Sequence, residues 1–135
     1  MRETLRVPTH QREALVDITE AVERAVRDCG IQDGLAALYV QGATAALMIQ
    51  ENWDESVPRD AAHLLQQLIP RGVWEHDAQD GNGDAHLKAG IVGPSESIPV
   101  LDGRLGLSTW QGIFLCDFDG PRRERRVLCT FLETH

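Results

Sequence analysis

The sequence predicts one α+β domain that spans residues 1–135 and is built mainly from antiparallel strands. A chain of 135 residues with 42% hydrophobic and 25% charged residues has the size and composition of a single globular domain. Its apolar runs are short, and turn residues separate them. The elements expected below follow the order strands, helix, strands, helix, strands, which argues against a regular array of parallel strands and crossover helices.

The N-terminal part of the chain is predicted to form two strands and a helix. Segments 4–8 and 14–18 alternate apolar and polar residues, which is typical of strands. Thr19 is a plausible N-cap for a helix that follows it. Two glutamates in the first turns of this helix interact favourably with the helix dipole. Gly30 supplies the end of this helix. The apolar face of the helix consists of Val22, Ala25, Val26 and Cys29.

Residues 34–50 contain no charged side chain and resemble a membrane span at first sight. The run is short for a span, and polar residues around Gly42 interrupt its middle. Two buried strands over 35–41 and 44–50 fit the pattern better, so no membrane partner is expected.

A second helix is predicted to begin at Ser56 and to end at Pro70, with Pro58 in its first turn. We expect His63 on this helix to be solvated. The apolar stripe of the helix is expected to face the core and consists of Val57, Ala61, Leu64, Leu65 and Leu68.

The C-terminal half is predicted to be a polar loop followed by strands. The loop covers 72–84. Prolines and Asp-Gly or Gly-Pro pairs mark the turns and edges after it. The four predicted strands cover 86–92, 97–101, 109–118 and 126–132.

Charge and cysteine usage exclude several classes of protein. The net charge of −8 argues against nucleic acid as a partner, since phosphate backbones are bound by clustered Lys and Arg. The three cysteines form no C-x-x-C pair and lie in apolar surroundings, which predicts reduced, buried thiols in a cytoplasmic protein. The N-terminus has no apolar core of the kind that signal peptides carry.

The stretch WEHDAQDGNGDAHLKAG, residues 74–90, is the first candidate site. It is not an EF-hand loop, because the positions that require glycine and glutamate hold Asn82 and Lys88. If 86–92 is a strand, then Asp84, His86 and Lys88 share one face, and the glycine-rich loop can return His76 to them. Such a set can bind a metal ion or an oxyanion, and the alternative is a solvated hairpin loop.

Three further polar clusters are candidates. Gln50-Glu51-Asn52-Trp53-Asp54 directly follows a buried strand, where binding groups are often placed, although it can equally be a helix approach loop. Thr109-Trp110-Gln111-Gly112 can bind a ring by stacking and hydrogen bonding, although such a tryptophan is more often part of the core. The run 121–126 (PRRERR) is either an anion-binding corner, a subunit contact or a solvated turn.

Taken together, these pieces resemble the YjbQ-like family, also called the secondary thiamine-phosphate synthase family. The resemblance rests on AALMIQENWDESVPRD, on NGDAHLK at 82–88, on TWQG at 109–112 and on DGPRR at 119–123, and it covers about residues 5–133. It implies a β-sandwich of about seven strands with two helices, assembled as a homotrimer. It also implies a weak transferase activity that joins phosphorylated pyrimidine and thiazole precursors into thiamine phosphate, in a family whose physiological role is unsettled.

The resemblance also implies a site built around three histidines, near the Gln50–Asn52 and Trp110–Gln111 segments. By motif match, His76 and His86 are two of them and would be metal ligands or anion donors. Glu51 would be a ligand or a base. The residues expected to bind a phosphorylated substrate or another anion are Gln50, Asn52, Asn82, Asp84, Lys88, Trp110 and Gln111.

The chain departs from the family pattern at the first histidine. The family segment H-T-[ST]-A-[AS]-L is GATAAL here, so Gly42 stands in place of the histidine and Ala43 in place of a threonine. Catalytic zinc typically has three protein ligands, so Zn²⁺ or Mg²⁺ binding is expected to be weakened unless Glu51 or Asp84 replaces the lost ligand. The sequence therefore leaves two functions open: a transferase, or a non-catalytic trimer that binds a ligand or anion through a decayed metal site.

Overall fold

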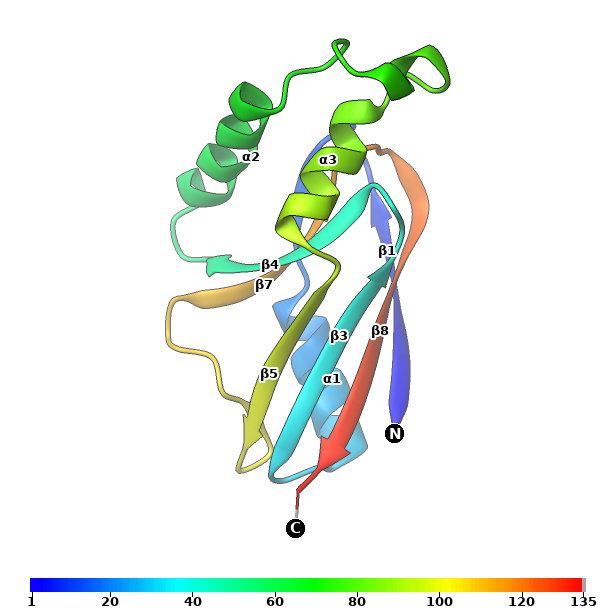
Figure 1. Cartoon of the computed structure of the whole chain (residues 1–135). Helices are drawn as coiled ribbons and strands as arrows, with labels where there is room; N and C mark the ends of the chain where they lie inside the picture. The colour runs from blue at the N-terminus through cyan, green and yellow to red at the C-terminus, as the bar shows by residue number, and fades with distance from the viewer. Residues whose placement is uncertain (135) are drawn as a thin grey trace.

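The computed structural model describes residues 1–134, which form an α+β domain with two antiparallel sheets. The five-stranded sheet has the order β1-β8-β3-β5-β6, and the three-stranded sheet has the order β2-β7-β4. Figure 1 shows the elements along the chain. The strands are β1 (Arg2–Thr9), β2 (Ala14–Asp17), β3 (Gly34–Gln41), β4 (Ala45–Glu51), β5 (Ser95–Leu101), β6 (Arg104–Leu105), β7 (Gln111–Asp117) and β8 (Arg122–Glu133). The helices are α1 (Thr19–Cys29), α2 (Ser56–Leu68), α3 (Gly83–Val92) and the short 3₁₀ helix η1 (Glu75–Ala78).

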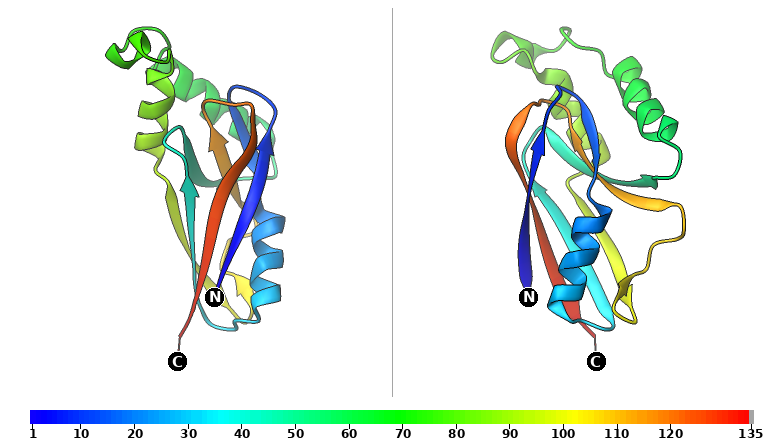
Figure 2. Two further views of the ribbon diagram at one scale, coloured as in Figure 1. Left: turned by 90° about the vertical axis from the view of Figure 1, so that its right-hand side faces the viewer. Right: turned by 180° about the vertical axis from the view of Figure 1, so that it is seen from behind.

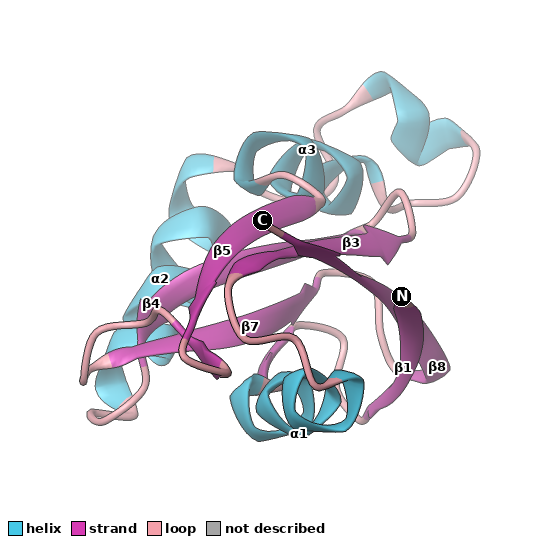
Figure 3. Cartoon of the chain, turned by 90° about the horizontal axis from the view of Figure 1, so that it is seen from below, coloured by secondary structure: helices cyan, strands magenta, loops and turns pink. Residues whose placement is uncertain are grey.

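The three-stranded sheet is buried on both faces, which explains the uncharged run in β4. On one face, Leu47 and Leu115 join the core between the two sheets. On the other face, Ala46 and Phe114 pack against α2 and α3. A strand that is covered on both sides carries apolar residues without alternation, as this run does. The view from below shows the strands with α1 on one side and α2 and α3 on the other (Figure 3).

The helix α1 covers the inner face of the five-stranded sheet. Its buried residues are Val22, Ala25 and Val26, and Gly30 ends it in the left-handed conformation with φ 78°. Figure 2 shows α1 in front of this sheet when the molecule is viewed from behind. Strand alternation then places Tyr39 and Leu132 on the outer face, where both are about half exposed.

Most predicted elements are confirmed, but the strand over 86–92 is wrong. These residues belong to α3, which runs from Gly83 to Val92. Ala85 and Ala89, one helical turn apart, pack on the three-stranded sheet. The apparent alternation of HLKAGIV therefore hides a helical period, and its apolar members Leu87 and Ile91 are exposed.

Several smaller expectations also need correction. In α2, Leu65 is buried as predicted, but Leu64 and Leu68 point to solvent. The helix α1 begins at Thr19 itself, whose backbone N–H and hydroxyl donate to Asp17. The loop over 72–84 contains η1, and β6 was not predicted.

The cysteines are free, as predicted. Cys116 and Cys129 are buried and Cys29 is partly exposed. Burial raises the pKa of the Cys116 thiol to about 12 and that of Cys129 to about 12, so both stay protonated near neutral pH. Among the described residues, no helix is long and apolar enough to span a bilayer.

Candidate functional site

The loop before α3 folds back and brings His76 against His86. The two ring centroids are 4.8 Å apart and the ring planes meet at 86°, an edge-to-face contact. His76 also lies 3.5 Å from Asp80, measured between Nε2 and Oδ2. In the stretch 74–90, the loop therefore folds back and brings its two histidines into contact.

Asp77 holds this loop closed. Its carboxylate accepts hydrogen bonds from the backbone N–H groups of Trp74 at 3.0 Å and Gly83 at 2.8 Å. These two bonds lower the pKa of Asp77 below its usual value. Gly83 is required for the close approach, because a Cβ there would lie 2.8 Å from the Cβ of Trp74.

His86 lines a hollow of about 560 Å³ at one end of the molecule. The turn between β3 and β4 supplies Gly42, and the N-terminal end of α3 supplies Asn82 and His86. The β7–β8 turn supplies an acid, and the first residues of β8 supply three arginines and a second acid. The complete lining consists of Gln41, Gly42, Ala43, Thr44, Asp80, Asn82, His86, Asp119, Arg122, Glu124, Arg125 and Arg126. Gly42, where the family resemblance implies a histidine, and His86 therefore line the same hollow.

Arg125 is the buried cation of this hollow. Only 5% of it is exposed, and its Nη2 donates to Asp117 Oδ1 at 2.7 Å and to Thr44 Oγ1 at 2.8 Å. Asp117 also accepts from Thr9 Oγ1 at 2.6 Å. Burial alone would raise the pKa of Asp117, but the hydrogen bonds from Arg125, Thr9 and Asp119 outweigh burial and lower it. The Arg125–Asp117 pair is therefore charged at neutral pH.

The sequence patterns left the role of Arg125 open among an anion-binding corner, a subunit contact and a solvated turn. The signal that could have placed it is the alternation of β8. Every second residue of this part of the strand is buried, namely Arg125, Val127, Cys129 and Phe131. Arg125 therefore belongs to the inward face of the strand, whereas its neighbours Arg122 and Arg126 are exposed.

Lys88 does not face the histidine hollow, contrary to the expectation. Because the segment is helical, Asp84 and Lys88 lie on one face of α3 and His86 on another. Lys88 Nζ donates to Asp84 Oδ2 and to Glu13 Oε1, both at 2.8 Å, and the side chain is 1% exposed. Arg12 also donates to both carboxylate oxygens of Asp84.

This network assigns a new role to Asp84 and Lys88. Burial alone would raise the pKa of Asp84, but the hydrogen bonds from Arg12 and Lys88 outweigh burial and lower it. The carboxylate of Asp84 and the ammonium of Lys88 are therefore both paired with charged groups of the same domain. The network ties α3, which carries His86, to the segment between β1 and β2. Neither Arg12 nor Glu13 of that segment was expected from the sequence patterns.

The two other predicted segments lie at the opposite end of β4. In the β4–β7 pair, Ala45 opposes Asp117 near the hollow, whereas Glu51 opposes Gln111. The seven residues of β4 separate these ends by roughly 20 Å. Within one chain, Glu51 and Gln111 are therefore not brought to His76 and His86.

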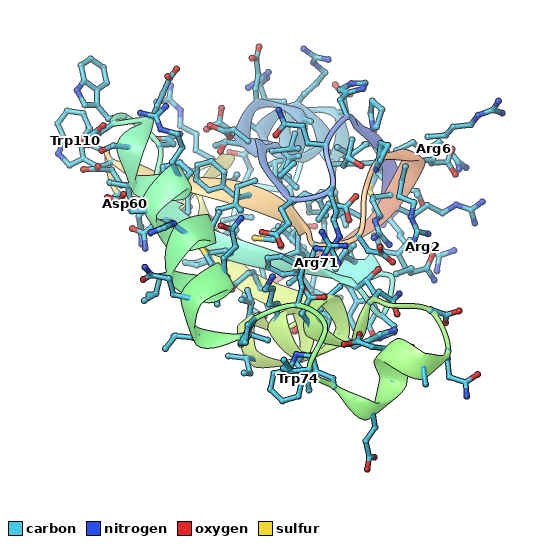
Figure 4. All side chains as sticks on the ribbon, turned by 90° about the horizontal axis from the view of Figure 1, so that it is seen from above. Arg2, Arg6, Asp60, Arg71, Trp74 and Trp110 are labelled. Atoms are coloured by element: carbon cyan, nitrogen blue, oxygen red, sulfur yellow. The ribbon has the colours of Figure 1, made fainter. Side chains whose placement is uncertain are left out.

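The far segments form an exposed aromatic pair held by local polar contacts. The rings of Trp53 and Trp110 are 5.3 Å apart between centroids, and both are at least half exposed. Gln50 and Gln111 accept hydrogen bonds from nearby backbone N–H groups, and the Asn52 amide donates to Asp17. Figure 4 shows Trp110 at one side of the molecule and Arg6 at the other.

The residues present do not fit the implied metal site. Among the described residues, no group of three His, Cys, Asp or Glu side chains is placed to hold a metal ion. His76 and His86 supply two ligands, and position 42 supplies none. The candidate replacements for the third ligand are also committed elsewhere, since Glu51 lies at the far end of β4 and Asp84 binds Lys88 and Arg12.

Comparison with known proteins identifies the family. The model of the family described as "UPF0047 protein YjbQ-like" matches residues 3–134. The chain belongs to the YjbQ-like family. A UPF0047 protein of Methanocaldococcus jannaschii is 45% identical over 117 residues, which cover 87% of this YjbQ-like chain and 84% of that protein. The UPF0047 protein YugU of Bacillus subtilis is 41% identical over 90% of this chain and 92% of its own.

Solved structures of this family have the same fold. A YjbQ-like protein of unknown function from Sulfolobus solfataricus superposes with a TM-score of 0.95 at 33% identity, over 99% of this chain and 97% of that one. A hypothetical protein of Aeropyrum pernix superposes with a TM-score of 0.93 at 36% identity, over 99% of both chains. The family and the α+β fold implied by the resemblance are therefore confirmed.

Proposed function

We propose that this YjbQ-like protein binds a phosphorylated small molecule in the hollow beside His86 and acts as a weak transferase. The reaction would join a pyrimidine pyrophosphate and a thiazole phosphate into thiamine phosphate, as the family resemblance implies. The observation that carries the proposal is the shared hollow of His86, Asn82 and Arg125, with His76 against the His86 ring. Imidazole and guanidinium donors are suited to phosphoryl oxygens.

The chemistry of this transfer places its main demand on the leaving group. The thiazole nitrogen donates its lone pair to the CH₂ carbon of the pyrimidine, and the C–O bond to pyrophosphate breaks. Pyrophosphate leaves with the bonding electrons and the thiazole nitrogen becomes cationic, so no proton is transferred. Donors beside the hollow would stabilise the developing negative charge, and the remote position of Glu51 is consistent with a step that needs no base.

A thiamine-phosphate assay with purified protein tests this proposal. We expect slow product formation in the wild type and a loss of roughly tenfold or more in His86→Ala, because one donor to the leaving group is removed. His63→Ala is the matched control, since His63 is an exposed histidine on α2. Equal rates in both variants would contradict the assignment of His86.

The alternative is a ligand-binding protein without turnover, and Gly42 at the family histidine position favours it. In the same assay, this function predicts no product from the wild type while phosphate-bearing ligands still bind. Binding that is lost in His86→Ala but retained in His63→Ala would then assign the hollow to ligand capture alone.

We also propose that three copies assemble through the outer face of the five-stranded sheet. Leu35 on β3 pairs with Leu132 on β8 and with Pro99 on β5, so an apolar row crosses three strands of this face. Tyr39 and Leu101 extend it and are exposed in the single chain. Large exposed apolar patches are typical of association surfaces.

This assembly predicts a large change in mass when a charge is placed on the face. We expect the wild type to have three times the 15.0 kDa mass of one chain in light scattering, and Leu132→Glu to have the mass of one chain. Leu64→Glu on α2 is the matched control, because Leu64 is 53% exposed and Leu132 is 54% exposed. A wild type that runs as a single chain would refute the proposal.

A further inference from the structure

Arg125, one of the residues that line the hollow beside His86, has a buried hydrogen-bond donor that the protein does not use. Arg125 Nε is buried and has no hydrogen-bond partner among residues 1–134. Nη2 of the same guanidinium donates hydrogen bonds to Asp117 and Thr44. An unpaired buried donor destabilises the folded protein, so a ligand that accepts from Nε recovers that free energy.

Asn82, another residue of this lining, has a buried acceptor without a partner. Asn82 Oδ1 makes no hydrogen bond with the described part of the chain, whereas Nδ2 of the same amide donates to Asp119 Oδ2 at 2.8 Å. The carboxylate can only accept, so it fixes which end of the amide faces it. The free end of the amide is therefore an oxygen, which needs a donor from elsewhere.

The ligand must be selected by directional hydrogen bonds and not by a net charge of the hollow. The lining contains three arginines and three acids. Arg122 pairs with Asp119 at 3.2 Å and Arg126 pairs with Glu124 at 2.8 Å, so most of these charges cancel locally. The buried polar atoms of the lining that have no partner within residues 1–134 are one guanidinium N–H, which requires an acceptor, and one amide oxygen, which requires a donor.

Position 42 allows the Arg125 guanidinium to lie close to the backbone. A Cβ on Gly42 would lie 2.8 Å from Arg125 Nη1, so the guanidinium approaches the backbone where a side chain would otherwise stand. In this chain, the hollow therefore has an arginine donor beside position 42 and lacks the third histidine of the implied metal site.

We propose that this hollow recognises, without a metal ion, a phosphoryl group that presents an oxyanion together with an O–H or N–H donor. Arg125 Nε donates to the oxyanion, and Asn82 Oδ1 accepts from the donor. Inorganic hydrogen phosphate is the simplest species with both features, whereas sulfate has the same shape but no donor. The inference rests on the proposed function, because it specifies the ligand of the same site.

Calorimetric titration of the full chain with inorganic phosphate and with sulfate, in a buffer that contains a chelator, tests the inference. We expect phosphate to bind roughly tenfold or more tightly than sulfate, since sulfate would leave the Asn82 oxygen facing another acceptor. Equal affinities, or phosphate binding that requires added zinc, would overturn the inference.

Two variants separate the two contacts. Arg125→Lys keeps a cation beside Asp117 but removes the Nε donor, so phosphate affinity should fall roughly tenfold or more. Asn82→Ala removes the acceptor, so the ratio of phosphate to sulfate affinity should approach one. Arg104→Lys is the matched control, because Arg104 lines a different hollow beside α1.

The outcomes also distinguish this inference from the transferase proposal. A phosphate preference without thiamine phosphate formation supports the inference and removes the transferase. Thiamine phosphate formation without a phosphate preference supports the transferase proposal and contradicts the inference. An Arg125→Lys variant that binds phosphate as the wild type does would show that Nε does not contact the ligand, and the inference would fail.

Discussion

Replacing Asp84 with alanine is expected to lower the free energy of unfolding by about 3–5 kcal/mol, because it leaves the Lys88 ammonium buried beside Glu13 alone. Asp84 is fully buried and accepts from Lys88 and from Arg12. Removing one partner of a buried pair costs far more than the pair contributes, since the remaining charge keeps its desolvation cost. Chemical denaturation at neutral pH measures the loss.

The chain contains a closely matched control for this prediction. Glu55 and Arg59 on α2 have the same i,i+4 spacing and order, but their side chains are 91% and 72% exposed. Glu55→Ala should change stability by less than about 0.5 kcal/mol, because exposed pairs contribute little. If Asp84→Ala costs no more than Glu55→Ala, the buried network has no energetic role.

The same network predicts how stability responds to acid. The pKa of Asp84 is lower in the folded protein than in the unfolded chain, where it is about 3.9. The ionised carboxylate therefore contributes fully to the free energy of unfolding above the unfolded pKa, and this contribution is lost as the pH falls through the lower pKa of the folded protein. Wild-type stability should therefore fall below pH of about 4. Asp84→Ala should show a shallower decline over this range, which denaturation at several pH values can resolve.

The fold was largely predictable because, in most of its elements, the pattern of apolar residues in the sequence matches the faces that are buried in the structure. The uncharged run of β4 follows from burial on two faces, and the helix α1 follows from its apolar face and its terminal Gly30. The helix α3 was not predictable from alternation, because its buried residues are the small Ala85 and Ala89 and its buried charges satisfy each other. A local sequence pattern does not show that two charged side chains will be buried because they pair with each other.

The candidate site was predictable only in its local part. His76 and His86 lie ten residues apart in sequence, and the Asp77 hydrogen bonds close the loop between them. The position of Glu51 depended on the direction of β4, which carries it away from the hollow. Arg125 was obscured because it lies in a run of exposed charges, although its register with Val127 marked the inward face.

Placing a histidine at position 42, where the family resemblance implies one, is expected to create a zinc site in the Gly42→His variant. Gly42 and His86 line one hollow, and His76 contacts His86, so an imidazole at position 42 would supply the third nitrogen ligand. The new Cβ would lie 2.8 Å from Arg125 Nη1, which must shift. That atom is the end of a flexible side chain, so the shift is possible, but it competes with the contacts of Arg125 to Asp117 and Thr44.

Elemental analysis after purification without chelator or affinity-tag metal measures the outcome. We expect about one zinc ion per Gly42→His chain and far less in the wild type, because catalytic zinc usually needs about three protein ligands. Gly42→Ala controls for the added Cβ, and Gly42→His with His86→Ala should lose the metal again. Near-stoichiometric zinc in the wild type would mean that another residue completes the site. In that case the phosphoryl group would be recognised beside a metal ion, and the metal-independent role of Arg125 would be refuted.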